Sequence, residues 1–150
     1  MMKIPMEELY QEVILDHNRN PRHYGELQPH DAHAHGYNAL CGDTYDVYLR
    51  IKNNRISDVG FTGQGCAISK ASASMMTTKT KGLLLSEARD LANQFLVMST
   101  QENVSDAQRS ALGSLKIFEG VKKFPIRVKC ATMAWHTLKE ALETWRTQHE

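Results

Sequence analysis

The sequence predicts an α+β fold in a single domain, with an antiparallel three-stranded sheet and helices packed on it. Two stretches near the middle of the chain carry apolar residues on alternate positions, which is the period of half-buried strands. Longer stretches on either side carry apolar residues at helical spacing. Because the strands come as a group and most helices follow them, the order is typical of an α+β domain. A chain of 150 residues suffices for one core but is short for two, so one domain is expected over residues 1–150.

The first element is predicted to be a helix from Met6 to His17. Pro5 fits a first turn, and the apolar residues that follow it recur at helical spacing until the chain reaches Asn20-Pro21. The next stretch is polar and rich in turn-forming residues, so a loop is predicted as far as His35. His33 and His35 are interpreted as solvated side chains of this loop rather than as metal ligands.

The sheet is predicted between residues 36 and 62. The residues from Tyr45 to Ile51 alternate apolar and polar side chains, and Asn53-Asn54 then supplies a turn. Residues 56–62 continue as a second strand, with Val59 and Phe61 on one face, so the two strands are expected to form a hairpin. Residues 36–40 are expected to add the third strand.

Three helices are predicted after the sheet. Ala67 to Lys79 is rich in small residues and contains no proline, and Ser86 is a predicted N-cap for a second helix. Residues 99–114 are polar and small, which indicates an insertion or a short mobile helix before a break at Pro125. The last helix is predicted from an apolar stripe that includes Trp135, whose indole is expected to pack in the core.

The composition disfavours several classes of function. Lysine and arginine number 18 against 17 aspartates and glutamates, so no basic field would attract nucleic acid or an anionic membrane. No apolar run approaches the roughly 20 residues of a membrane-spanning helix. Met1 to Leu15 contains three glutamates where a secretion signal would be apolar, so the protein is expected to be cytoplasmic. Three cysteines in a reducing compartment are more often metal ligands, catalytic groups or core residues than disulfides.

Each cysteine is predicted to lie at the end of a helix or strand. Cys41-Gly42-Asp43 precedes the hairpin, and the glycine would let both flanking side chains bend toward one point. Cys66 opens a predicted helix, where unpaired amides favour a thiolate. Cys130 is likewise expected at a helix start, after the positive charges of Arg127 and Lys129.

Three thiolates and one carboxylate would form a tetrahedral zinc site, and the same donors could hold a small iron–sulfur cluster. The spacing alone leaves a shared site open, because there is no repeated C-x-x-C pair and cysteines this far apart can be unrelated. A small buried residue for Cys66 and a turn residue for Asp43 are the alternatives at those positions.

Longer motifs surround the three cysteines. They are Gly36-Tyr37-Asn38 with Cys41-Gly42-Asp43, and Gly63-Gln64-Gly65-Cys66-Ala67-Ile68-Ser69 with Ala71-Ser72-Ala73-Ser74-Met75-Met76. The pattern extends over nearly the whole chain through Asn20-Pro21, Gly25, Arg127-Val128-Lys129-Cys130-Ala131 and Trp135. Together these motifs resemble the IscU/SufU family of iron–sulfur cluster assembly proteins, whose domain is similar to the N-terminal part of NifU.

The resemblance implies that Cys41, Asp43, Cys66 and Cys130 are the metal and sulfur ligands. Two features favour the SufU branch: Lys129 stands where the scaffold branch has a histidine, and residues 99–120 form a spacer that the scaffold branch lacks. Members of the SufU branch look like zinc-dependent sulfurtransferases. They accept persulfide sulfur from a cysteine desulfurase of the SufS type, a pyridoxal phosphate enzyme, and serve downstream iron–sulfur assembly proteins.

The resemblance further implies that Cys41 accepts the sulfur, released when a histidine of the partner replaces it on zinc. Arg127 is expected to offset part of the negative charge of the site. Two alternatives stay open: a scaffold that assembles a transient iron–sulfur cluster on the same ligands, and a purely structural zinc module. A cysteine hydrolase is disfavoured, because His136 lies nearly two helical turns beyond Cys130.

Overall fold

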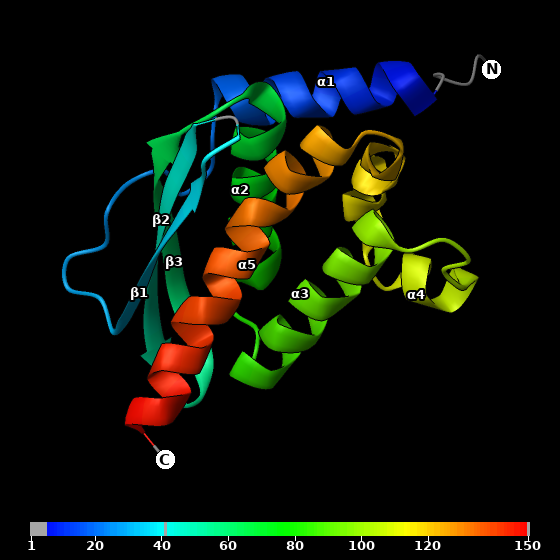
Figure 1. The fold of residues 1–150 in the computed structure, drawn as a ribbon. Coiled ribbons are helices and arrows are strands. Elements are labelled where there is room, and N and C mark those ends of the chain that lie inside the picture. The colour runs from blue at the N-terminus through cyan, green and yellow to red at the C-terminus, as the bar shows by residue number, and fades with distance from the viewer. Residues whose placement is uncertain (1–5, 41, 150) are drawn as a thin grey trace.

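Three antiparallel strands form one layer of the computed structural model, and helices cover one face of this layer (Figure 1). The structure describes residues 6–40 and 42–149. The strands β1 (Ala32–Asn38), β2 (Asp43–Lys52) and β3 (Arg55–Gln64) pair in the order β1-β2-β3. The predicted fold class and the three-stranded antiparallel sheet are therefore confirmed.

The hairpin of β2 and β3 has the two-residue turn that the sequence predicts. Lys52 pairs with Arg55, and the two residues between them, Asn53 and Asn54, both have positive φ. Asparagine tolerates the left-handed conformation, and a turn with two such residues matches the twist of the paired strands. The alternation along β2 is also confirmed, because Tyr45, Val47 and Leu49 are fully buried.

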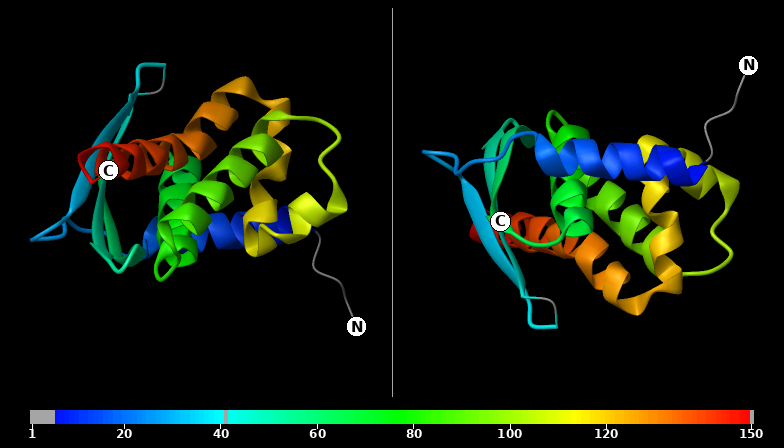
Figure 2. Two further views of the ribbon diagram at one scale, coloured as in Figure 1. Left: turned by 90° about the horizontal axis from the view of Figure 1, so that it is seen from below. Right: turned by 90° about the horizontal axis from the view of Figure 1, so that it is seen from above.

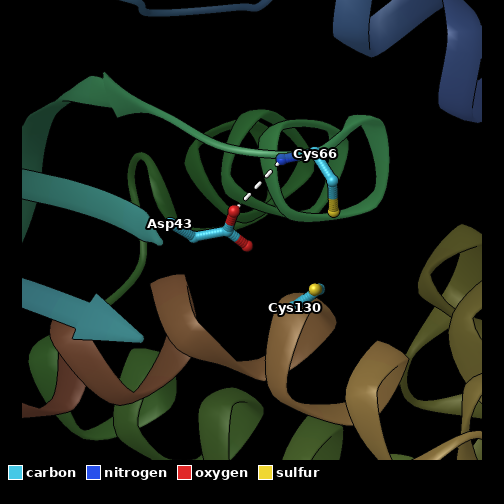
Figure 3. Close-up of side chains that lie close together, drawn as sticks. All are labelled: Asp43, Cys66 and Cys130. Atoms are coloured by element: carbon cyan, nitrogen blue, oxygen red, sulfur yellow. Dashed lines mark hydrogen bonds between the residues drawn. The ribbon is translucent and has the colours of Figure 1, made fainter. Parts of the chain in front are cut away.

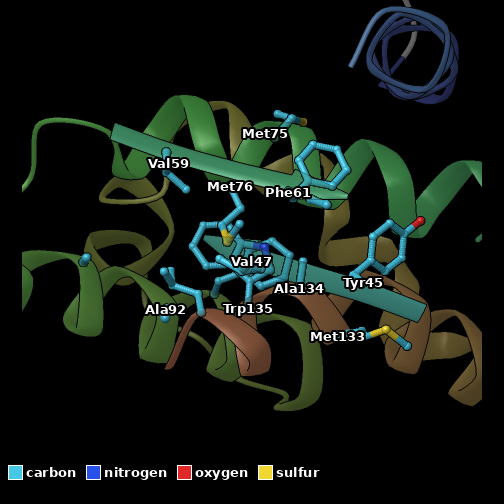
Figure 4. Close-up of a cluster of buried hydrophobic side chains, with 14 of the residues drawn as sticks. Tyr45, Val47, Val59, Phe61, Met75, Met76, Ala92, Met133, Ala134 and Trp135 are labelled. Atoms are coloured by element: carbon cyan, nitrogen blue, oxygen red, sulfur yellow. The ribbon is translucent and has the colours of Figure 1, made fainter. Parts of the chain in front are cut away.

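The helices lie behind the sheet in two layers. The helices α2 (Ala67–Thr80) and α5 (Pro125–Gln148) pack on the inner face of the sheet and against each other, and α3 (Leu85–Thr100) packs on the far side of α5. The helix α1 (Met6–Arg19) packs against α2. Figure 4 shows the core that results, in which Trp135 of α5 lies beside side chains of β2, α2 and α3. Trp135 is fully buried and its indole stacks on Phe95 with ring centroids 4.6 Å apart.

The connection between α3 and α5 contains a short helix, α4 (Asp106–Ser110), and a 3₁₀ helix, η1 (Gly113–Lys123). Both views in Figure 2 place these elements at the end of the molecule away from the sheet. Leu115, Phe118 and Val121 of η1 are buried, so this half of the connection belongs to the core. Whether residues 99–120 are an insertion specific to one branch of the family stays a prediction.

Two predicted helix starts are wrong. The N-cap of α3 is Leu84, whose backbone N–H donates to the Glu87 carboxylate, whereas Ser86 lies inside the helix. The last helix begins at Pro125, because a proline has no N–H to lose in a first turn. The helix therefore starts earlier than predicted.

No helix within the described ranges is both long enough and apolar enough to cross a bilayer.

Candidate metal centre

Three of the four predicted ligands meet at one end of the sheet. Asp43 begins β2, Cys66 precedes α2, and Cys130 lies in α5. Their possible ligand atoms all lie within 4.8 Å of one another, and Figure 3 shows the three side chains converging. Among the described residues this is the one group of three or more His, Cys, Asp or Glu side chains that could hold a metal ion, and it contains a carboxylate and two thiols. Segments distant in the sequence therefore form one cluster, named here the candidate centre.

Asp43 supplies the clearest sign that the candidate centre suits a cation. Its side chain is buried, and its Oδ1 accepts a hydrogen bond from the Cys66 backbone N–H at 3.2 Å. Its Oδ2 is buried without a hydrogen-bond partner among the described residues. A buried carboxylate oxygen without a partner is costly. A bound cation beside the two sulfurs would remove that cost.

Cys66 is the N-cap of α2, as the sequence predicts. Its Sγ accepts a hydrogen bond from the Ser69 backbone N–H at 3.5 Å, in the way that a serine or aspartate caps a helix. Cys66 is exposed, so its sulfur lies at the opening of the candidate centre.

Gly65 allows the approach of Asp43 to Cys66. A Cβ at this position would lie 2.7 Å from Asp43 Oδ1 and 2.4 Å from Ser69 Oγ. Both contacts are shorter than side chains tolerate, so only glycine fits between them. The glycine of the Gly63-Gln64-Gly65-Cys66 motif thus has a packing role beside the centre.

Cys130 does not lie at a helix start, which corrects the sequence prediction. It lies in the second turn of α5 and is 4% exposed. Its place opposite Cys66 depends on how α2 and α5 pack. The Trp135 Nε1–H donates to Ser72 Oγ at 3.1 Å, and the Ser72 hydroxyl donates to the Ala131 carbonyl at 2.5 Å. This pair of hydrogen bonds joins the two helices through Ala131, which is next to Cys130, and through Trp135.

The structure does not show the other two predicted site residues, Cys41 and Arg127, at the candidate centre. Cys41 lies outside the described residues. Its neighbour Gly42 donates its N–H to the Asn38 carbonyl in the connection between β1 and β2, immediately before Asp43. Arg127 is exposed, and its guanidinium lies 4.5 Å from the centroid of the Phe124 ring. Its role as a supporting charge therefore stays a prediction.

Two residues beside the candidate centre were missed by sequence reasoning. Ser69 Oγ lies 2.9 Å from the Tyr45 hydroxyl, 3.0 Å from the Cys66 carbonyl oxygen and 3.7 Å from Cys66 Sγ. Burial raises the pKa of Tyr45 well above its ordinary value, so its hydroxyl stays protonated. The position of Ser69 three residues after a capping cysteine was a signal for this contact, but nothing in the sequence pointed to Tyr45.

His33 and His35 do not lie in a loop, as was predicted, but in β1. Residues two apart on a strand share a face, and both imidazoles contact Asp46 of β2. His33 Nε2 lies 2.8 Å and His35 Nδ1 lies 3.1 Å from the same oxygen, Asp46 Oδ1. We name His33, His35 and Asp46 the outer-face cluster. Its side chains are 27–56% exposed.

The donors of the candidate centre fit zinc. Two thiols and a carboxylate are present in the described part of the chain, and Cys41 is the predicted fourth donor beside Asp43. Thiolate donors favour zinc or an iron–sulfur cluster over magnesium or calcium, which prefer oxygen.

Comparisons with known proteins show the family of the chain. Residues 9–131 match the family model described as "NifU-like N terminal domain". The scaffold protein IscU of Streptococcus pyogenes is 40% identical over 92% of this chain and 85% of its own length. The zinc-dependent sulfurtransferase SufU of Bacillus subtilis is 36% identical over 91% of both chains.

The fold is also shared with solved structures. A crystal structure described as a putative iron–sulfur cluster assembly scaffold protein for the SUF system of Fervidobacterium islandicum superposes with a TM-score of 0.82. It is 32% identical and covers 91% of this chain and 98% of its own. The predicted family is thereby confirmed, and the chain belongs to the IscU/SufU family of proteins with a NifU-like N-terminal domain.

Proposed function

We propose that the protein is a zinc-dependent sulfurtransferase, which accepts persulfide sulfur on Cys41 from a cysteine desulfurase for iron–sulfur cluster assembly. The observation that carries the proposal is the convergence of Asp43, Cys66 and Cys130, where one buried carboxylate oxygen has no hydrogen-bond partner in the described part of the chain. The similarity to the B. subtilis sulfurtransferase supports the same function.

The residues that would hold zinc are Asp43, Cys66 and Cys130 together with Cys41. When bound, zinc keeps the thiols ionised at neutral pH and withdraws part of their charge. Asp43 is fixed by the Cys66 amide, and Cys66 is fixed by the Ser69 amide. Cys130 is fixed by its helix, so these three donors are held by the fold while Cys41 accepts the sulfur.

The transfer itself is a thiol–disulfide type of exchange. The Cys41 thiolate attacks the outer sulfur of the persulfide on the desulfurase cysteine. A new S–S bond forms on Cys41 while the old S–S bond breaks, and the desulfurase cysteine leaves as a thiolate. No oxidant or reductant is consumed, because one sulfane sulfur and its electrons move from one thiol to another.

The surface beside the candidate centre suits a protein partner. Tyr37 and Leu40 are 65% and 68% exposed, next to the connection that contains Cys41. A groove of about 600 Å³ between β1 and α5 adjoins them, and Leu40, Lys129 and Met133 are among the residues that line it. Exposed apolar side chains beside a reactive site are typical of protein interfaces.

A cluster scaffold is the second candidate function, favoured by the 40% identity to the S. pyogenes scaffold protein. The same thiols and carboxylate can hold a small iron–sulfur cluster. Metal analysis of the purified protein separates the two functions. About one zinc per chain supports sulfur transfer, whereas stoichiometric iron and sulfide support the scaffold.

The test of the proposal is a desulfurase activity assay with and without the zinc-loaded protein. We expect stimulation by the wild-type chain and none by the Cys41→Ala variant, whose folding is checked by urea unfolding. The control is Ser99→Ala in α3. Ser99 is buried, and its hydroxyl donates to the Phe95 carbonyl of the same helix. Equal stimulation by Cys41→Ala and the control would refute the role of Cys41.

A further inference from the structure

Ser69 contacts Cys66 through both its backbone N–H and its hydroxyl. Its backbone N–H donates to Cys66 Sγ at 3.5 Å, and its hydroxyl oxygen lies 3.7 Å from the same sulfur. The hydroxyl also lies 3.0 Å from the Cys66 carbonyl oxygen. Both polar groups of Ser69 are thus directed at one cysteine.

Tyr45 decides which way the Ser69 hydroxyl can donate. The Tyr45 hydroxyl lies 2.9 Å from Ser69 Oγ, and both residues are almost completely buried. A phenol is a good donor and a serine hydroxyl carries a single proton. When Tyr45 donates to Ser69, that proton is available to Cys66, either to its carbonyl oxygen or to its sulfur.

In this structure the Ser69 hydroxyl donates to the Cys66 carbonyl oxygen at 3.0 Å, and the Cys66 thiol donates to Ser69 Oγ at 3.7 Å. The neutral thiol can donate its own proton to Ser69 Oγ, whereas a thiolate can only accept. A hydrogen bond to a charged acceptor is roughly twice as strong as one between neutral groups. A zinc-bound Cys66 sulfur would therefore compete with the Cys66 carbonyl oxygen for the Ser69 hydroxyl, beside the Ser69 backbone N–H from which it already accepts.

We propose that Ser69, oriented by Tyr45, is a positioning residue that keeps Cys66 bound as a holding ligand while sulfur is accepted elsewhere in the site. Hydrogen bonds to a metal-bound thiolate fix its direction and withdraw charge from the sulfur, which lowers its nucleophilicity. The inference rests on the proposed function, because it assigns to Cys66 the role of holding zinc and leaves to Cys41 the role of accepting sulfur.

The test compares Ser69→Ala and Tyr45→Phe with two controls that are chemically matched. Ser99→Ala removes another buried serine hydroxyl, and Tyr48→Phe removes a tyrosine hydroxyl that lies 3.5 Å from Thr62 Oγ1, away from the centre. Zinc affinity is measured by competition with a chelating dye. The zinc-loaded protein is alkylated with iodoacetamide, and mass spectrometry measures the extent of alkylation at each cysteine. Cobalt(II) replaces zinc as an absorbing probe of thiolate coordination.

For Ser69→Ala we expect about a tenfold loss of zinc affinity, since outer partners of metal ligands typically contribute 10–100-fold. Alkylation should rise selectively at Cys66, and the cobalt–thiolate absorption should shift. Tyr45→Phe should change all three in the same direction by less, and it keeps the inference testable if Ser69→Ala does not fold. If the wild-type chain binds zinc and both variants behave like their controls, the role of Ser69 is refuted while the proposed function stands. A wild-type chain that binds neither zinc nor cobalt would overturn the proposed function as well.

Discussion

The candidate centre and the outer-face cluster both contain an aspartate of β2, yet the two carboxylates differ in burial and in hydrogen-bond partners. Asp43 faces the interior, is 2% exposed, and has one oxygen without a partner among the described residues. Asp46 faces the other side of the sheet, is 27% exposed at its side chain, and accepts contacts from two histidines through one oxygen. Both clusters contain metal-binding residue types, but of the two only the candidate centre has a buried carboxylate oxygen without a partner among the described residues.

The difference shows that residue type is a poorer guide to a metal site than the presence of buried donor atoms without hydrogen-bond partners. A half-exposed carboxylate keeps its hydration, and an ion pair there contributes little. A buried carboxylate loses its hydration and needs a partner. In the outer-face cluster both imidazoles contact Asp46 Oδ1, at 2.8 and 3.1 Å, so that this carboxylate already has partners.

The largest expected effect separates the two aspartates. Asp43→Ala should weaken zinc binding by about 100-fold or more, since loss of a direct ligand should cost at least the upper end of what loss of an outer partner costs. That factor corresponds to about 2.7 kcal/mol. Asp46→Ala on the same strand is the matched control and should leave zinc affinity unchanged. Competition with a chelating dye measures both, and an equal loss in the two variants would remove the distinction between the clusters.

The second effect concerns the packing of α2 on α5, on which only the candidate centre depends. Ser72→Ala should destabilise the metal-free protein by about 1–3 kcal/mol, because it leaves the Trp135 N–H without its buried partner. Ser99→Ala should cost less than about 1 kcal/mol, since the Phe95 carbonyl keeps its helical environment. Urea unfolding measures both, and equal midpoints would show that Ser72 does not join the helices.

A third substitution tests the tight corner at Gly65. Gly65→Ala should lower zinc affinity by at least about tenfold, because the added methyl group collides with the Asp43 carboxylate and the Ser69 hydroxyl. Gly120→Ala in η1 is the control, since open space surrounds that position and its φ is not positive. Zinc titration of both proteins checks the prediction, which fails if Gly65→Ala binds zinc like the control.

The smallest effect is expected on the outer face of the sheet. Replacing His33 and His35 together by alanine should leave zinc stoichiometry at about one per chain and change the free energy of unfolding by less than about 1 kcal/mol. Metal analysis and urea unfolding of the double variant provide the measurements. A fall in bound zinc would show that the outer-face cluster, rather than the candidate centre, holds the metal.

Much of the fold was predictable because its signals are local. The alternation through Tyr45, Val47 and Leu49 identified β2, and Asn53-Asn54 identified its turn, because both depend on the chain's own geometry. The start of α3 was misplaced because only the second half of a capping box forms there, the bond from the Leu84 N–H to the Glu87 carboxylate, and a leucine side chain gives no sequence signal for an N-cap. The loop predicted around His33 was wrong because pairing with β2 overrides the polar character of that stretch.

The sequence by itself determined the types of donor and, through the family resemblance, which residues were candidates. Only the tertiary structure decided that Asp43, Cys66 and Cys130 share one site, since helix packing through Ser72 and Trp135 brings α5 beside the end of α2. It also decided that Asp43 would be buried, with one oxygen lacking a partner among the described residues, whereas Asp46 would lie on the exposed face and contact two histidines. The physical reason is that convergence and burial are properties of the folded chain, which no local pattern encodes.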